Sequence, residues 1–440
     1  MSDTVIHSWQ RLHASLAVRH DAISAQRQRG LMHFQAVGFP TRRDEAWKYL
    51  DLRALARTEY ALPSAKGIDA VTVDELALHH DSHRLVFVDG QFAAHLSRIN
   101  ELPDGLTLTP LSQRLSAGDI PADLFSLIDE QRTPFTALNQ AFVADGAAVA
   151  LAPHCVVERP IELVFVSRAH DTPVAIHPRI VIRSGSQSQA TVLEHYVSLG
   201  HAANLTNVVT EIQLEEGAHL DHYLLQEQGE RDVRIGNLRA DQARDTHFSS
   251  YALTLGGALT RNDLCTELNG DSAQSDFWGL FFGQGHQLID NHTVVNHNRP
   301  RTFSNENYKG ILGGRARGIF NGRVYIKRDA QQVRGYQSNA NLLLSDRAEI
   351  DTKPELEIYA DDVQCSHGAT TGQLDQEALF ALRSRGIDAK MARAMLTLAF
   401  AGEVLQATTL PAVAKRVERA VAGELPGRFN LTDMVGLLDG

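Results

Sequence analysis

The chain has 440 residues, of which 43% are hydrophobic and 22% charged, as is typical of a soluble globular protein with two or three domains. A formal net charge of -11 argues against general nucleic-acid binding, because that function needs a positive surface to displace counterions from phosphate. The three cysteines are widely spaced, which argues against a disulfide framework. We find no signal peptide and no apolar window of roughly 20 residues, so we expect neither secretion nor a membrane span, and we expect a cytoplasmic protein.

The first 60 residues have the apolar periodicity of helices. Trp9, Leu12 and Leu16 recur at helix-like intervals. A Gly-Phe-Pro-Thr run at 38–41 ends one helix, because glycine favours a helix C-terminus and proline cannot continue the hydrogen-bond ladder. We expect a new helix to start at Thr41.

The next part of the chain mixes strand and helix signals. An Asp-Gly pair at 89–90 lies between two apolar runs, which predicts a β-hairpin with a tight turn. Residues 121–145 predict a further helix whose apolar stripe includes Leu124 and Ile128. We therefore assign residues 1–147 to an N-terminal domain of helices and mixed structure.

Residues 148–373 contain short alternating runs separated by Gly, Asn, Asp and Ser, for example at 191–195 and 210–214. Since no helix-length segment separates them, the pattern leaves two choices: a large sandwich or barrel, or a stacked β-solenoid. Small and amide residues recur where a coil would turn a corner, as at 269–272, and this favours the solenoid. No literal sequence repeat decides between the two.

Residues 374–440 return to a helical pattern. Asp375 and Asp388 can each cap a helix, and the apolar positions after them repeat at helical spacing. Roughly 60 residues are too few for an independent core. We expect this C-terminal helical domain either to pack on the end of the solenoid or to offer an apolar face to a partner.

Familiar nucleotide-binding and hydrolase motifs are missing from the sequence. It has no P-loop, no Gly-x-Ser-x-Gly elbow and no His-Glu-x-x-His pair. The glycines at 313–318 lie between strand-like runs, so we interpret them as tight corners rather than a dinucleotide site. The basic stretch from Arg299 to Arg334 is interpreted as a solvated face balanced by acids on neighbouring rungs, with an acidic partner as the alternative.

The segment at 360–370 carries the most informative chemistry, because Cys365 and His367 are two residues apart. In a strand both side chains would leave the same face. Thiolate and imidazole are common ligands of iron, zinc and iron–sulfur clusters, yet two groups cannot fill a tetrahedral site. Any metal would need further ligands, from elsewhere or from another chain. The alternative interpretation is that Cys365 is a small buried hydrophobe.

Several long motifs resemble the SufB/SufD family of iron–sulfur cluster assembly proteins. They occur in the same order and are densest between residues 290 and 400, at 307–312, 318–324, 336–345, 354–358, 360–370 and 379–387. The N-terminal runs at 38–41 and 45–49 also look like the family pattern. The Cys-Ser-His-Gly-Ala-Thr form at 365–370, together with few cysteines, is similar to the SufD branch of that family.

The resemblance implies a mainly β fold with a right-handed parallel β-helix core at 148–373. This core would be flanked by N-terminal helical and mixed structure and by C-terminal helices at 374–440. It implies a scaffold subunit with no catalytic residue of its own, in a SufBC2D complex with SufB and two copies of the ATPase SufC. The β-helices of this chain and SufB would pair, and the C-terminal helices would dock SufC. A second copy of this chain would be the partner when the chain is isolated.

The resemblance also implies a site. His367 matches a family histidine proposed to bind the nascent iron–sulfur cluster at the SufB interface, and Cys365 is the neighbouring candidate ligand. The cluster would be shared with SufB. A reduced flavin is associated with such complexes, and no residue here gives it a place.

Two other function classes remain as alternatives to a scaffold subunit. A secreted-type β-helix enzyme acting on carbohydrates would need clustered carboxylates, and Asp361-Asp362 is the only tempting pair. A stand-alone metal-storage protein would need more ligands than one cysteine and one histidine.

Overall fold

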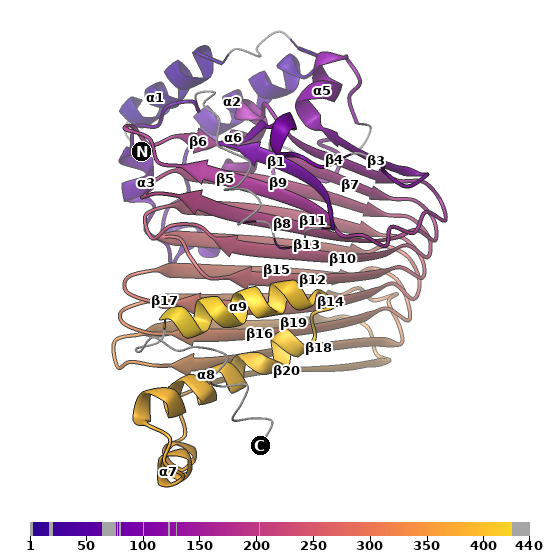
Figure 1. Ribbon diagram of the computed structural model, residues 1–440. Helices are drawn as coiled ribbons and strands as arrows, with labels where there is room; N and C mark the ends of the chain where they lie inside the picture. Colours follow the sequence, from indigo (N-terminus) through magenta and orange to yellow (C-terminus); the bar gives the residue numbers. More distant parts are fainter. Residues whose placement is uncertain are drawn as a thin grey trace.

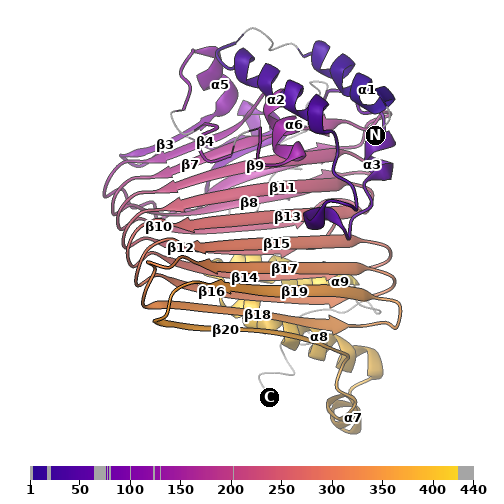
Figure 2. The same cartoon turned by 180° about the vertical axis from the view of Figure 1, so that it is seen from behind.

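The computed structural model describes residues 3–16, 21–63, 76, 78, 81–99, 101–121, 124–128, 130–201 and 203–424, so the end of the expected C-terminal domain, 425–440, lies outside the described residues. Two stacked sheets form its body, with helices at both ends of the sequence (Figures 1 and 2). The N-terminal helices of the described residues are α1 (Asp3–Ala14), α2 (Ser24–Val37), α3 (Arg53–Arg57), α5 (Leu111–Ser116) and α6 (Pro134–Phe142), with short 3-10 turns at Glu45–Trp47 and Ala94–Leu96.

The first sheet runs from the hairpin to the last strand of the chain. Its order is β2 (Gln91–Phe92), β1 (His83–Val88), β5 (Ile161–Arg168), β8 (Gln189–Leu199), β10 (His219–Glu227), β12 (His247–Thr254), β14 (Gln274–Gly283), β16 (Phe303–Leu312), β18 (Val333–Leu343) and β20 (Val363–Gly372). All pairs between the long strands are parallel.

The second sheet holds the strands between them. Its order is β3 (Leu106–Pro110), β4 (Gly146–Leu151), β7 (Arg179–Ser184), β9 (Leu205–Leu214), β11 (Val233–Gln242), β13 (Leu259–Leu268), β15 (Leu288–His297), β17 (Arg317–Ile326) and β19 (Glu349–Ile358), with β6 (Ala175–Ile176) beside β9. From β7 onward the chain alternates between the sheets, so the fold is a parallel β-solenoid of about eight turns rather than a sandwich. The expected β-helix core is confirmed.

One left-handed residue recurs at a corner of successive turns. These residues have positive φ and lie 27 to 31 positions apart: Gln187, Gly217, Asp245, Ser272, Arg301 and Gln332. Each donates its backbone N–H to a carbonyl of the following turn. This hydrogen-bond column offsets the strain of a left-handed non-glycine residue. Because five of the six are not glycine, the structural repeat leaves no literal repeat in the sequence.

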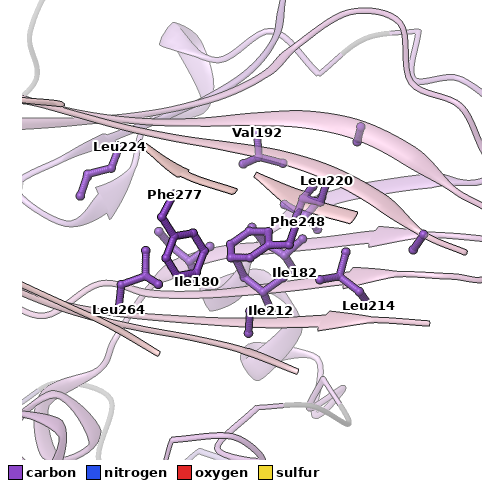
Figure 3. Packing of buried hydrophobic residues seen from close by; sticks show 14 of the residues in the cluster. Ile180, Ile182, Val192, Ile212, Leu214, Leu220, Leu224, Phe248, Leu264 and Phe277 are labelled. Atoms are coloured by element: carbon purple, nitrogen blue, oxygen red, sulfur yellow. The ribbon is translucent and has the colours of Figure 1, made fainter. Parts of the chain in front are cut away.

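The space between the sheets, here called the lumen, is filled mainly by apolar side chains. Figure 3 shows Val192, Phe248 and Phe277 of the first sheet facing Ile182 and Ile212 of the second. All five are fully buried. Alternate residues of each strand thus form the core, as the period of two requires.

Helices cover the outer faces of the sheets rather than the lumen. Trp9, Phe34 and Phe142 of the N-terminal helices pack with Leu205 and Ile235 on the outside of the second sheet. The C-terminal helices are α7 (Gln376–Ser384), α8 (Ala389–Gln406) and α9 (Pro411–Glu424). Figures 1 and 2 place α8 and α9 against the first sheet.

The contacts of the C-terminal helices are both apolar and polar. Val413 and Val417 share a buried cluster with Tyr223, on the outer face of β10. The Tyr251 hydroxyl donates to the carbonyl of Ala407 at 3.0 Å. Asp375 and Asp388 cap α7 and α8, as expected. The C-terminal helices therefore pack on the solenoid, but on the outer face of the first sheet rather than on the end that we expected.

Two local predictions were wrong and one is confirmed. The β1–β2 hairpin turns through Asp89 and Gly90, both with positive φ. The helix expected over 121–145 is shorter, since α6 begins only at Pro134. Before it, the backbone N–H groups of Phe125 and Ile128 donate to the buried Glu211 carboxylate, and these hydrogen bonds hold the chain in turns instead. The helix expected at Thr41 is a single 3-10 turn at Glu45–Trp47.

The domain division at residues 147 and 373 stays a prediction. The strands β1 and β3, which precede residue 147, pair into the two sheets and so extend the solenoid. Within the described residues, no helix is both long and apolar enough to cross a membrane.

Substituting Gly279 by alanine should destabilise the solenoid. A Cβ there would lie 2.1 Å from Cδ1 of Tyr308, which stands in register on the next strand and is 2% exposed. We expect a loss of about 1–3 kcal/mol in the free energy of unfolding, measured by urea denaturation. Gly368→Ala is the matched control, because none of the described atoms lies within 4 Å of its Cβ position. Equal urea midpoints for the two variants would contradict the prediction.

Candidate functional site

The candidate thiol–imidazole pair lies on β20, the last strand of the first sheet. Cys365 is in register with Gly335 of β18, and His367 is in register with Gln337. Gln337 is 3% exposed and faces the lumen, so its register partner faces the same side. The structure therefore brings Cys365 and His367 onto one face, at the end of the lumen.

Cys365 is half-buried. It packs against the apolar lumen, and a Cβ on Gly335 would lie 3.5 Å from its Sγ. Burial raises the pKa of the Cys365 thiol, and the backbone N–H of Gly335 opposes that effect. In the isolated chain the group is therefore a thiol rather than a thiolate at neutral pH, and a metal that binds it has to displace the proton.

His367 is exposed, and so is most of β20. β19 on the opposite sheet is also only partly buried. Among the described residues, β20 pairs with β18 alone, so its other edge presents unpaired backbone groups. The last turn of the solenoid thus offers the pair of side chains and an open strand edge together.

The described residues contain no group of three or more His, Cys, Asp or Glu side chains placed to hold a metal ion. Cys155 and Cys265 are buried elsewhere, the first beside β4 and the second on β13. Burial raises the pKa of both thiols. Asp361 and Asp362, considered for carbohydrate chemistry, lie exposed in the bend before β20.

A buried polar column, defined here as Glu306 and Gln337 together with Thr293, which faces them from β15 of the second sheet, is in register with His367 of the first sheet. The Thr293 hydroxyl donates to the Glu306 carboxylate. Gln337 Nε2 donates to Glu306 Oε1 at 3.1 Å. Burial raises the pKa of Glu306 to about 7, although both hydrogen bonds lower it. Sequence analysis missed this column because only the register reveals it; the sole signal is polar residues at alternate positions of β16 and β18.

Four side chains of the basic stretch, Arg301, Lys309, Arg317 and Arg323, pair with acidic side chains, which agrees in part with the balanced face that we expected. Arg317 pairs with Asp351 at 2.6 Å, and Arg323 pairs with Glu357 at 2.9 Å. Lys309 pairs with Glu403 of α8 at 2.7 Å. Gly313 and Gly314 lie in the corner between β16 and β17, as expected, whereas Gly318 is part of β17.

The short helix α7 carries the most exposed large apolar side chain of those described. Phe380 is 72% exposed, whereas its neighbour Leu379 is buried. An isolated exposed phenylalanine on a helix face is a common anchor of protein interfaces.

The fold and this site define a β-solenoid subunit that presents a thiol–imidazole pair at an open end. The model of the SufBD core domain, from the SUF system of FeS cluster assembly, matches residues 165–400, and the model of the SufBD N-terminal region matches 6–163. The chain therefore belongs to the SufBD family and is a subunit of iron–sulfur cluster assembly.

The chain is similar to curated relatives over most of its length. It is 32% identical to the iron–sulfur cluster assembly protein SufD of Escherichia coli, over 97% of this chain and 98% of that protein. It is 30% identical to an iron–sulfur cluster assembly SufBD family protein of Synechocystis, over 93% of each chain. It is 27% identical to the SufD protein of Bacillus subtilis, over 74% of this chain and 76% of that protein. The resemblance seen in the sequence motifs is confirmed.

Glu306→Gln should stabilise the protein more at pH 8 than at pH 5. Between the unfolded pKa near 4.5 and the folded pKa of about 7, the native state keeps a proton that the unfolded state releases, so stability falls as pH rises. The loss is complete above pH 7 and amounts to roughly 3 kcal/mol, which the amide does not incur. Thermal unfolding of both proteins at both pH values measures this. A difference in melting temperature that is the same at both pH values would contradict it.

Proposed function

We propose that this chain is a non-catalytic scaffold subunit that pairs with SufB and supplies ligands to a nascent iron–sulfur cluster at their interface. The observation that carries the proposal is the position of Cys365 and His367 on one face of the last, exposed strand. The cluster is cargo that passes through this site. The chain works in the cytoplasm, and ATP hydrolysis belongs to the partner SufC.

The open edge of β20 supports pairing with a second solenoid. Unpaired backbone groups of an edge strand bind another strand readily, and SufB is the partner that a shared family fold favours. Pairing at this end encloses the lumen and brings ligands of the partner toward Cys365 and His367. When SufB is absent, a second copy of this chain pairs through the same edge.

The two side chains suit iron chemistry in different ways. His367 is exposed, so iron can reach its imidazole from solvent. Cys365 must lose a proton that its surroundings retain, so iron binding and thiol deprotonation are coupled. We therefore propose His367 as the primary ligand and Cys365 as the second. A reduced flavin in the assembled complex remains part of this proposal, without a place in this chain.

The C-terminal helices are the proposed docking site for SufC. Since α8 and α9 cover the first sheet, movement of a docked ATPase would be transmitted to the solenoid through contacts such as that of Lys309 with Glu403. The exposed Phe380 on α7 is the proposed anchor. The remaining residues of the expected docking domain, 425–440, lie outside the described part of the chain.

His367→Ala should leave folding and partner assembly intact while lowering the amount of cluster. After anaerobic reconstitution, we expect the iron and sulfide bound per SufB-containing complex to fall by more than about tenfold. Even the loss of a residue that only hydrogen-bonds a metal ligand lowers metal affinity by that factor. His286→Ala is the control, because His286 is an exposed histidine in a distant corner. Unchanged iron and sulfide in the His367→Ala complex would refute the ligand role.

Phe380→Asp should weaken the capture of SufC by more than about tenfold without changing the melting temperature. Deleting the C-terminal helices would be a poorer test, because it uncovers the first sheet. Met32→Asp is the matched control: Met32 is 59% exposed on α2, outside the proposed docking surface. Binding of purified SufC to each variant measures the effect, and equal affinity for both variants would move the docking site elsewhere.

A further inference from the structure

Gln337 carries a buried hydrogen-bond acceptor that is not used within the described chain. Its Nε2 donates to Glu306 Oε1, but its Oε1 has no partner among the described residues. The side chain is only 3% exposed. Buried polar atoms are rarely left unpaired, so this oxygen needs an explanation.

The position of Glu306 decides which end of the amide remains free. The Glu306 carboxylate lies on the adjacent turn and accepts a hydrogen bond from Gln337 Nε2. Gln337 Oε1 points away from Nε2, so it is left for a different donor. The neighbouring turn on the other side of β18 is β20, where His367 stands in register with Gln337. An imidazole N–H is a donor of the required kind.

The surroundings hold this amide in place. A Cβ on Gly322, across the lumen, would lie 2.2 Å from Gln337 Nε2, so the glycine makes room for the amide. The next amide on the lumen face of β18, Asn339, is occupied: its Nδ2 donates to the Tyr308 carbonyl and its oxygen accepts from Asn341. Gln337 is therefore the amide with a free oxygen at this end of the lumen.

We propose that Gln337 is a positioning residue for His367: its Oε1 accepts a hydrogen bond from one ring nitrogen and leaves the other ring nitrogen free to bind iron. The inference rests on the proposed function, in which His367 binds the nascent cluster. In the isolated chain His367 is exposed, and no hydrogen bond between these two described residues is formed. When a partner covers the end of the lumen and excludes water, the second ring nitrogen needs an acceptor, and Gln337 supplies it.

Three variants of the chain in its SufB- and SufC-containing complex test the role. Gln337→Met removes the amide at nearly the same volume. In Gln337→Glu, the two neighbouring buried carboxyl groups share one proton, and the introduced carboxyl group donates it to Glu306. The other oxygen of the introduced group is then still an acceptor. Gln228→Met is the matched control: Gln228 is 4% exposed, its Nε2 donates to Thr206, and its Oε1 has no partner among the described residues, but it lies far from β20.

The measurements are cluster affinity and the magnetic coupling of the histidine nitrogens. The cluster is reconstituted anaerobically from ferrous iron and sulfide, its affinity is measured by competition with an iron chelator, and nitrogen couplings are measured by pulsed EPR of the reduced cluster. We expect Gln337→Met to lose about 10–100-fold in affinity and to shift the coupling of the remote ring nitrogen, which reports its hydrogen bond. Gln337→Glu and Gln228→Met should match the parent.

His367→Ala separates the two levels of the argument. If that variant keeps the cluster and the nitrogen couplings, the proposed function itself is overturned. If it loses both while Gln337→Met retains the parent's affinity and couplings, only the role of Gln337 is overturned. A lower melting temperature of Gln337→Met with unchanged nitrogen couplings would likewise show a purely structural residue and overturn the inference.

Discussion

The backbone ladder between successive turns is the constraint on which the rest of this structure depends. Each long strand satisfies its N–H and C=O groups on the strands one turn before and one turn after it, in parallel register. Such a ladder has to end somewhere. At the first turns it ends in two short antiparallel additions, β2 and β3. At the last turn it ends on β20, a ten-residue strand whose outer edge pairs with none of the described residues.

The same ladder arranges side chains in columns, and a column inside the lumen is stable only when its members match. Phe87, Phe165 and Tyr196 stack with ring centroids 4.9 and 4.8 Å apart. A polar column is more demanding, because a buried group without a partner costs about 1–3 kcal/mol. Glu306 and Gln337 satisfy each other only in part, since one oxygen of the amide is left over. This leftover acceptor lies one turn from the open end, on the strand next to β20.

Sequence reasoning succeeded where the chemistry is local. The spacing of Cys365 and His367 placed both on one strand face, and the Asp-Gly pair at 89–90 placed a hairpin turn. It failed where a distant group decides the local structure: the Glu211 carboxylate holds the backbone around Phe125 in turns that apolar periodicity cannot reveal. The pairing of Glu306 with Gln337 was out of reach for a related reason, because turns of 27 to 31 residues put the register beyond any short pattern.

The placement of the helices completes the argument about the open end. A solenoid protects itself by covering its terminal turns, and this chain has helices enough for both ends. It uses them on the outer faces of the two sheets instead: the N-terminal helices contact Leu205 and Ile235, and the C-terminal helices contact Tyr223 and Tyr251. The lumen beside β20 is left with Cys365 half-buried and His367 exposed. A chain that covers its flanks while leaving a long strand edge and two candidate metal ligands uncovered has a surface suited to a second solenoid. The proposed pairing would also cover the unsatisfied amide of Gln337.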